Sequence, residues 1–196
     1  MNRFHRWYCR SGHWRHAMHD QILPWALRDV ELGERVLEVG PGPGVTTDAL
    51  RHRAPSLTAL EIDGVLAGSL AARFQSSNVT VEQGDATAMA FADATFTGAV
   101  CFTMLHHVPS VELQDQLLRE VRRVLIPGGT FVGSDSCSSL VFRLAHLADT
   151  MVLVEPGSFA ERLRAAGFVD VSVDAARRAF RFRARTPAGP VATLTP

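Results

Sequence analysis

Lysine is missing from this chain of 196 residues, and its absence removes several kinds of chemistry. A Schiff-base or lysine-nucleophile mechanism is excluded, and so is a phosphate loop that ends in Gly-Lys-Ser/Thr. The arginines and the acidic residues are equal in number, 20 of each, so the formal net charge is zero. A strongly electrostatic partner such as bulk nucleic acid is therefore not expected.

Cysteine is also scarce. Cys9, Cys101 and Cys137 are far apart and lack a C-x-x-C spacing, so we expect neither a disulfide framework nor a metal centre. No run of 18 apolar residues is present, and the Arg- and His-rich N-terminus does not resemble a secretory signal. These absences predict one cytoplasmic domain without a membrane span, and they leave its oligomeric state open.

The most informative segment that is present is an apolar run, 36–39, followed by glycines at every second position, Gly40, Gly42 and Gly44. It predicts a strand, a tight loop and a helix, with Thr46 or Thr47 as a helix cap. Glycine allows a positive φ and a close approach of a ligand to the main chain. Because Val45 stands where a dinucleotide motif needs glycine, a pyrophosphate is not indicated.

Two further apolar runs end in acids. The run 57–60 leads to Glu61 and Asp63, about 20 residues after the loop, where α/β nucleotide folds place an acid against a ribose. The run 79–82 leads to Asp85, whose carboxylate can accept from an exocyclic amine such as that of adenine. Two acids at successive strand ends predict an adenosine site.

With these pieces and two later ones, 99–108 and 123–131, the sequence resembles the class I S-adenosylmethionine-dependent methyltransferases over residues 34–185. The resemblance implies S-adenosylmethionine as the cofactor, with the methionyl part on the backbone of 40–44. It further implies that Glu61 binds the ribose hydroxyls and Asp85 the adenine amine, and that Ile62 and Ala86 flank the adenine.

The strand and helix signals alternate from Arg35 onward, as in a parallel sheet. With the resemblance, they predict an α/β fold: a Rossmann-like, mostly parallel seven-stranded sheet with helices on both faces and a C-terminal antiparallel hairpin. We expect strands near 35–39, 57–61, 79–82, 98–102, 129–134, 169–174 and 179–185. We expect helices near 45–53, 64–75, 111–125 and 157–166, and a partly helical segment at 138–154.

The chain divides into three parts by composition. Residues 1–33 form an aromatic, His-rich helical segment, which we expect either to cover one sheet face or to act as a lid over the acceptor site. Residues 34–185 form the cofactor-binding domain, and residues 186–196 a disordered tail. In the last strand Arg181, Arg183 and Arg185 share one face, which we expect to be solvated above a packed phenylalanine face.

Three positions carry competing interpretations. His106 and His107 leave the fourth strand at the ligand-binding edge, where either one could act as a catalytic base, or both could pack or cap the next helix. Glu38 could orient the donor's ammonium group or bond the loop amides. Asp63 lies two residues beyond Glu61, directly before Gly64, and we assign it to capping the helix that starts there.

We therefore predict an enzyme that transfers a methyl group from S-adenosylmethionine to an O, N or C atom of a small-molecule acceptor. Two alternatives remain. An RNA methyltransferase is disfavoured because 102–105 lacks the Asn/Asp-Pro/Leu-Pro-Tyr/Phe motif of the rRNA adenine dimethylases. A cofactor-binding interaction module without turnover is not excluded by any feature of the sequence.

Overall fold

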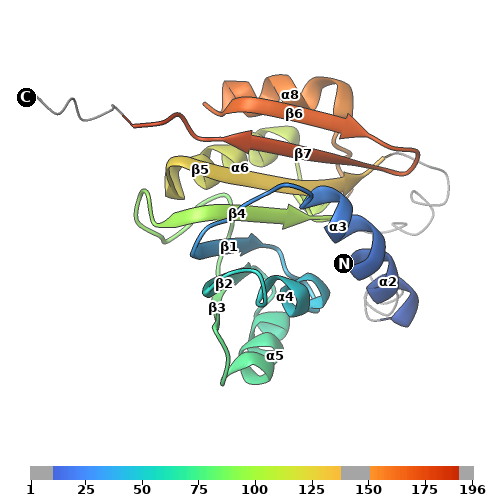
Figure 1. Cartoon of the computed structure of the whole chain (residues 1–196), viewed down its shortest axis with the longest axis vertical. Helices are drawn as coiled ribbons and strands as arrows, with labels where there is room; N and C mark the ends of the chain where they lie inside the picture. Colours follow the sequence, from blue (N-terminus) through green and yellow to red (C-terminus); the bar gives the residue numbers. More distant parts are fainter. Residues whose placement is uncertain (1–10, 138–150, 190–196) are drawn as a thin grey trace, which may run out of the picture.

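A computed structural model describes residues 11–137 and 151–189. Seven strands form one mixed sheet in the order β3-β2-β1-β4-β5-β7-β6, with only β7 antiparallel to its neighbours β5 and β6 (Figure 1). This confirms the predicted α/β class, the strand number and the closing hairpin. The strands are β1 (Arg35–Val39), β2 (Ser56–Glu61), β3 (Val79–Gln83), β4 (Phe96–Phe102), β5 (Leu125–Ser136), β6 (Val169–Ala175) and β7 (Ala179–Arg185).

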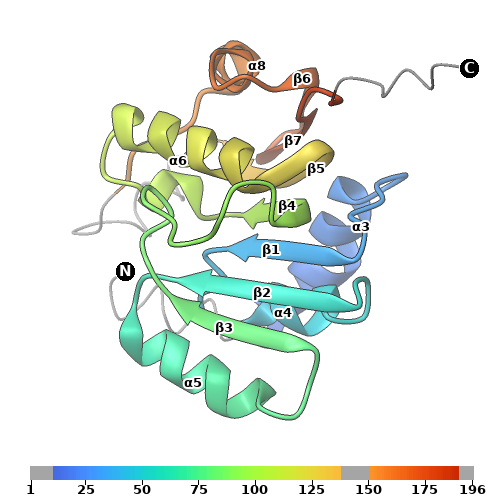
Figure 2. The ribbon, with the colours of Figure 1, turned by 90° about the vertical axis from the view of Figure 1, so that its left-hand side faces the viewer.

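Helices lie on both faces of the sheet, as predicted (Figure 2). They are α2 (Gly12–Ala17), the π-helical turn η1 (Met18–Ile22), α3 (Leu23–Ala26), α4 (Val45–Leu50), α5 (Gly64–Phe74), the 3-10 turn η2 (Leu105–His107), α6 (Val111–Val124) and α8 (Pro156–Ala165). None of the helices in the described ranges is long and apolar enough to cross a bilayer.

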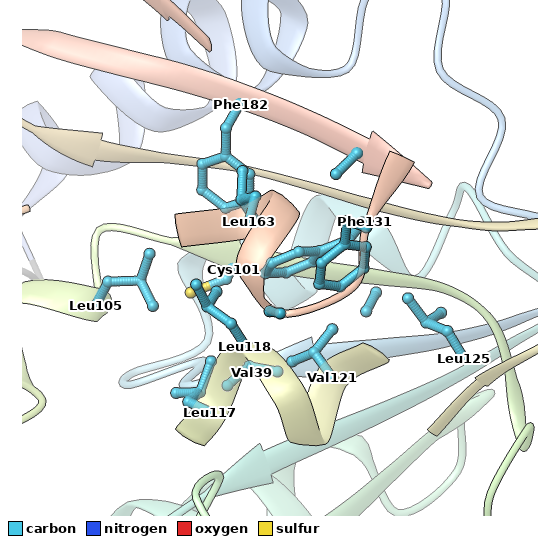
Figure 3. Packing of buried hydrophobic residues seen from close by; sticks show 14 of the residues in the cluster. Val39, Cys101, Leu105, Leu117, Leu118, Val121, Leu125, Phe131, Leu163 and Phe182 are labelled. Carbon is cyan, nitrogen blue, oxygen red and sulfur yellow. The ribbon is translucent and has the colours of Figure 1, made fainter. Parts of the chain in front are cut away.

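Each sheet face has its own hydrophobic core. On one face α6 and α8 bury leucines and valines against phenylalanines of the last strands (Figure 3). The ring of Phe182 lies 5.0 Å from that of Phe131 and 5.1 Å from that of Phe159. The other face buries Met18, Leu50 and Phe74 with residues of the N-terminal helices, α4 and α5. Both faces of the parallel strands are therefore covered, which such sheets require.

The N-terminal helices are bonded to strand β7 and to helix α4. Near α3, Arg181 of β7 donates to the carbonyl of Trp25 at 2.6 Å and lies 5.4 Å from its ring centroid. In η1, Nε2 of His19 donates to the carbonyl of Val45 at 2.9 Å. The buried phenylalanine face is confirmed, and on the arginine face Arg185 is exposed while Arg181 and Arg183 are partly covered.

Several element ends differ from prediction by a few residues. Helix α4 ends at Leu50 instead of residue 53, because the next residues close turns ahead of Pro55. Strand β5 begins at Leu125, which pairs with Phe96 before a register shift, so α6 stops one residue earlier than expected. Thr186 is buried and its hydroxyl donates to the carbonyl of Ile126 in β5, so the ordered chain continues past residue 185.

The segment expected to be partly helical, 138–154, lies largely outside the described residues. Its last part, 151–154, is described and has neither helix nor strand.

Candidate functional site

The glycine loop follows β1, and all three of its glycines have a positive φ: +67° at Gly40, +55° at Gly42 and +77° at Gly44. A Cβ atom at Gly40 would lie 2.3 Å from Cγ of Met104, and one at Gly44 would lie 2.4 Å from Cδ2 of Leu70. At Gly42 a Cβ would meet no atom within 4 Å. Gly42 therefore faces open space, where a ligand can approach the main chain.

The carboxylate of Glu38 is buried beneath this loop. It accepts hydrogen bonds from the hydroxyls of Thr46 and Thr47, the latter at 2.6 Å. We expected one of these threonines to cap α4, and this is wrong: Gly44 is the N-cap and no side chain caps the helix. The reason is that a buried carboxylate needs donors and takes both hydroxyls.

Glu61 ends β2 and ties the glycine loop to that strand. Its Oε2 accepts from the amide of Gly42 at 2.9 Å, and its Oε1 accepts from the amide of Asp63 at 3.0 Å. Asp63 instead caps α5, accepting from the amides of Val65 and Leu66 at 2.9 and 3.1 Å, which confirms that assignment. Of the two acids, Glu61 is therefore the one at the loop.

Asp85 follows β3 at the same edge of the sheet. In the parallel register Glu61 pairs with Gln83, and the amide of Gly84 donates to the carbonyl of Glu61 at 3.0 Å. The side chain of Asp85 is exposed, and its Oδ1 accepts from the amide and the hydroxyl of Thr87, each at 2.8 Å. The structure thus brings the two strand-end acids to neighbouring positions.

The two histidines after β4 differ in exposure. His106 is 2% exposed, its Nδ1 lies 2.5 Å from Oδ1 of Asp135, and its amide donates to Oδ2 of Asp135 at 3.2 Å. His107 is half-buried, with its ring centroid 4.2 Å from that of His106. Neither histidine caps the next helix, because Ser110 does so by accepting from the amide of Leu113.

Two buried polar residues behind these histidines were missed by the sequence analysis. Asp135 is the residue before the last one of β5, where an acid near the strand end could have signalled it. Gln114 gives no such signal: its amide donates to the carbonyls of Leu105, at 3.1 Å, and of Val152, at 2.8 Å. The amide of Val152 in turn donates to the carbonyl of His106 at 2.8 Å. Residues distant in sequence therefore hold the histidine turn.

Thr103 was also missed. It leaves β4 with a φ of +49°, which is unusual for a β-branched residue. Its amide donates to the carbonyl of Ser134 at 2.8 Å, and the next residue, Met104, packs against Gly40. Backbone strain of this kind gathers at ligand sites, where the surrounding structure enforces it.

Comparisons with known sequences and structures find proteins that are similar to this chain. Residues 37–133 fit the family described as a methyltransferase domain. The ubiquinone biosynthesis O-methyltransferase of Pseudomonas entomophila strain L48 is 29% identical over 131 residues, which make up 64% of this chain and 55% of that protein. The chain therefore spans about half the length of the curated relatives that it matches.

Two solved structures share the fold. The N-methyltransferase NodS of Bradyrhizobium japonicum, in complex with S-adenosyl-L-homocysteine, has a TM-score of 0.70 at 18% identity, covering 92% of this chain and 91% of NodS. The YcgJ protein of Bacillus subtilis has a TM-score of 0.67 at 16% identity, covering 91% of this chain and 100% of YcgJ.

Residues 37–133 form a methyltransferase domain. The sheet order and the glycine loop are those of the class I, Rossmann-like type, whose methyl donor is S-adenosylmethionine. The residues of this edge fit that donor: Gly42 leaves its main chain open, and Glu61 offers a carboxylate beside it. Ile62 is apolar yet 66% exposed, a surface that a flat adenine ring can cover.

Burial raises the pKa of Glu38 from 4.5 to about 7, although the hydrogen bonds from Thr46 and Thr47 act in the opposite direction. Because the folded pKa lies above the unfolded one, this stabilising contribution is complete below pH 4.5 and is lost as the pH rises to about 7. We expect Glu38→Gln to remove this dependence. Relative to wild type, the free energy of unfolding of the variant should rise by up to roughly 3 kcal/mol across that range.

Urea unfolding at several pH values measures this difference, and Glu82→Gln on the exposed side of β3 is the matched control. A difference between Glu38→Gln and wild type that stays constant with pH would contradict the burial of an ionisable Glu38.

Proposed function

We propose that the protein transfers a methyl group from S-adenosylmethionine to a small-molecule acceptor by in-line displacement. The observation that carries this proposal is the pairing of an open glycine loop with a loop-bound acid, Gly42 with Glu61, inside a methyltransferase domain. The small-molecule acceptor is supported by the curated relatives, which are named for O-methylation in ubiquinone biosynthesis.

Each binding role follows from the position of a residue at the sheet edge. We assign the ribose hydroxyls to Glu61 and the adenine amine to Asp85, since both carboxylates stand at adjacent strand ends. Ile62 and Ala86 flank the adenine, and the backbone of 40–44 takes the methionyl part. Glu38 is assigned to the donor's ammonium group: burial disfavours its ionised form and raises its pKa, and a bound cation would favour the ionised carboxylate again.

The bound donor supplies a methyl group that is already activated as a sulfonium. The chain itself has to hold donor and acceptor in line and to remove a proton where the acceptor carries one. Of the two histidines, we assign the base to His107, because His106 is almost fully buried and already bonded to Asp135. His106 and Asp135 then act as support for the turn that presents His107.

The assignment of Glu61 is tested by cofactor binding. Loss of a charged acceptor should weaken S-adenosylhomocysteine binding by about tenfold to hundredfold in Glu61→Gln. Gln still offers a carbonyl to the amide of Gly42, so the loop keeps one of its bonds. Titration calorimetry provides the measurement, with Glu82→Gln as the control, and an unchanged affinity in Glu61→Gln would remove this residue from the site.

Turnover is tested with S-adenosylmethionine labelled on its methyl group and fractions of a small-molecule cell extract. We expect label to reach one or more fractions. His107→Asn should lower the rate by about a hundredfold through loss of the base, while S-adenosylhomocysteine binding stays within about twofold of wild type, a change of under 0.5 kcal/mol.

The exposed His52, changed to Asn, is the matched control for this experiment. Cofactor binding without transfer of label to any fraction would contradict the enzyme and favour the non-catalytic alternative. Transfer to RNA alone would favour the RNA methyltransferase.

We propose that the N-terminal segment covers the cleft as a lid, from the side of the glycine loop. Arg15 of α2 lines a cavity together with Gly42 and Pro43, which places this helix beside the glycine loop. Removing residues 1–16 retains Met18 and His19, which anchor the segment to the core and to α4. We expect this truncation to lower methyl transfer about tenfold or more, because water is no longer excluded, and to leave cofactor affinity nearly unchanged.

Rates and affinities of the truncated chain are compared once an acceptor fraction is known. Equal losses in both would assign the segment a structural role, and full activity would exclude a lid.

A further inference from the structure

The connection between β3 and β4, residues 84–95, has no helix or strand and carries Asp85 at its start. A connection of this length is mobile unless side chains hold it. Three polar residues of α6, Gln116, Glu120 and Arg123, lie along one stripe of that helix, at spacings of four and three residues. All three bond the main chain of this connection.

Arg123 makes most of these bonds. Its Nη2 donates to the carbonyl of Met89 at 2.9 Å, and its Nη1 donates to the carbonyl of Phe91 at 2.7 Å. Its Nη1 also pairs with Asp93 at 2.7 Å. The guanidinium is held in this orientation by Glu120, which accepts from its Nε and Nη2, both at 2.8 Å. A planar guanidinium with several fixed donors suits such a role better than lysine would.

Glu120 and Gln116 complete the attachment. The Oε2 of Glu120 accepts from the amide of Met89 at 2.8 Å, so Met89 is held at both its amide and its carbonyl. Nearer to Asp85, Nε2 of Gln116 donates to the carbonyl of Thr87 at 2.9 Å. The carbonyls of residues 87, 89 and 91 are thus all bonded to α6, which places an extended stretch of the connection along the helix.

Thr87 links this attachment to Asp85. Its amide and hydroxyl both donate to Oδ1 of Asp85, so the orientation of the carboxylate depends on where Thr87 lies. Asp85 is exposed, and an exposed turn of this kind is weak when nothing else holds it. The position of the carboxylate is therefore set from α6, through Thr87.

We propose that Arg123 and Gln116 are positioning residues for adenine recognition: by bonding the carbonyls of residues 87, 89 and 91 they fix Asp85 where it accepts from the 6-amino group. This inference rests on the proposed function, in which Asp85 binds the adenine. It extends that function to two residues of α6, a helix that carries none of the residues assigned to the donor.

The test compares the affinity for S-adenosylhomocysteine with that for its hypoxanthine analogue, S-inosylhomocysteine, which has a carbonyl in place of the 6-amino group. Wild type should prefer the adenine compound by about tenfold or more, since a carboxylate acceptor is left facing a carbonyl in the analogue. Arg123→Gln should reduce this preference to under about threefold, because Asp85 is no longer held. Gln116→Met, which keeps the side-chain length, should also reduce this preference, because Gln116 bonds the carbonyl of Thr87.

Arg119→Gln is the matched control, an exposed arginine one turn before Arg123 on the same helix, and should keep the wild-type preference. Thermal unfolding shows which variants are folded at the assay temperature. If Arg123→Gln is unfolded there, the preference of Gln116→Met for the adenine compound tests the positioning role. A general loss of stability would weaken both ligands alike and leave the ratio unchanged.

A wild-type preference that persists in the folded variants would overturn the inference while leaving the role of Asp85 intact. A wild type that binds both ligands equally would overturn the assignment of Asp85 and, with it, this inference. Loss of preference in the variants but not in Arg119→Gln supports the positioning role.

Discussion

The glycine loop keeps its shape because carboxylates of two adjacent strands accept hydrogen bonds from the loop and from the helix that follows it. Glu38 of β1 binds the first turn of α4, and Glu61 of β2 binds the amide of Gly42. Three residues with positive φ would otherwise make this loop costly to order. With both acids in place the main chain at Gly42 stays open and fixed, and everything assigned to the donor is positioned relative to it.

The strand order explains why these acids meet at one edge. Strands β2 and β4 flank β1, and the chain passes to opposite sides of β1 as it forms them, which leaves a crevice at the carboxyl ends. Glu38 lies in β1, Glu61 ends β2 and Asp85 follows β3, whereas the histidine turn follows β4. In the proposed assignment, the donor side and the acceptor side of the site therefore lie on the two sides of β1.

Local signals were sufficient for the glycine loop and Glu61, and insufficient for contacts that depend on which side chains are buried. Glycine spacing and acids after apolar runs are properties of short segments, so the loop, Glu61 and the cap at Asp63 could be predicted. The hydrogen bonds of the Thr46 and Thr47 hydroxyls could not be predicted. Both donate to the carboxylate of Glu38, eight and nine residues earlier, and the burial of that carboxylate cannot be read from a short segment. Likewise, the burial of His106 is set by Asp135 on another strand.

The acceptor side depends on contacts between segments that are far apart in the chain. The amide of Val152 donates to the carbonyl of His106, and the side chain of Gln114 donates to the carbonyls of Leu105 and Val152. These hydrogen bonds join Val152 to η2. Through these bonds Gln114 and Val152 hold the turn that carries His107. The bond from Gly42 to Glu61, by contrast, spans 19 residues within one βαβ unit. In the proposed assignment, the contacts that shape the acceptor side come from segments outside this unit, which is consistent with one fold serving many acceptors.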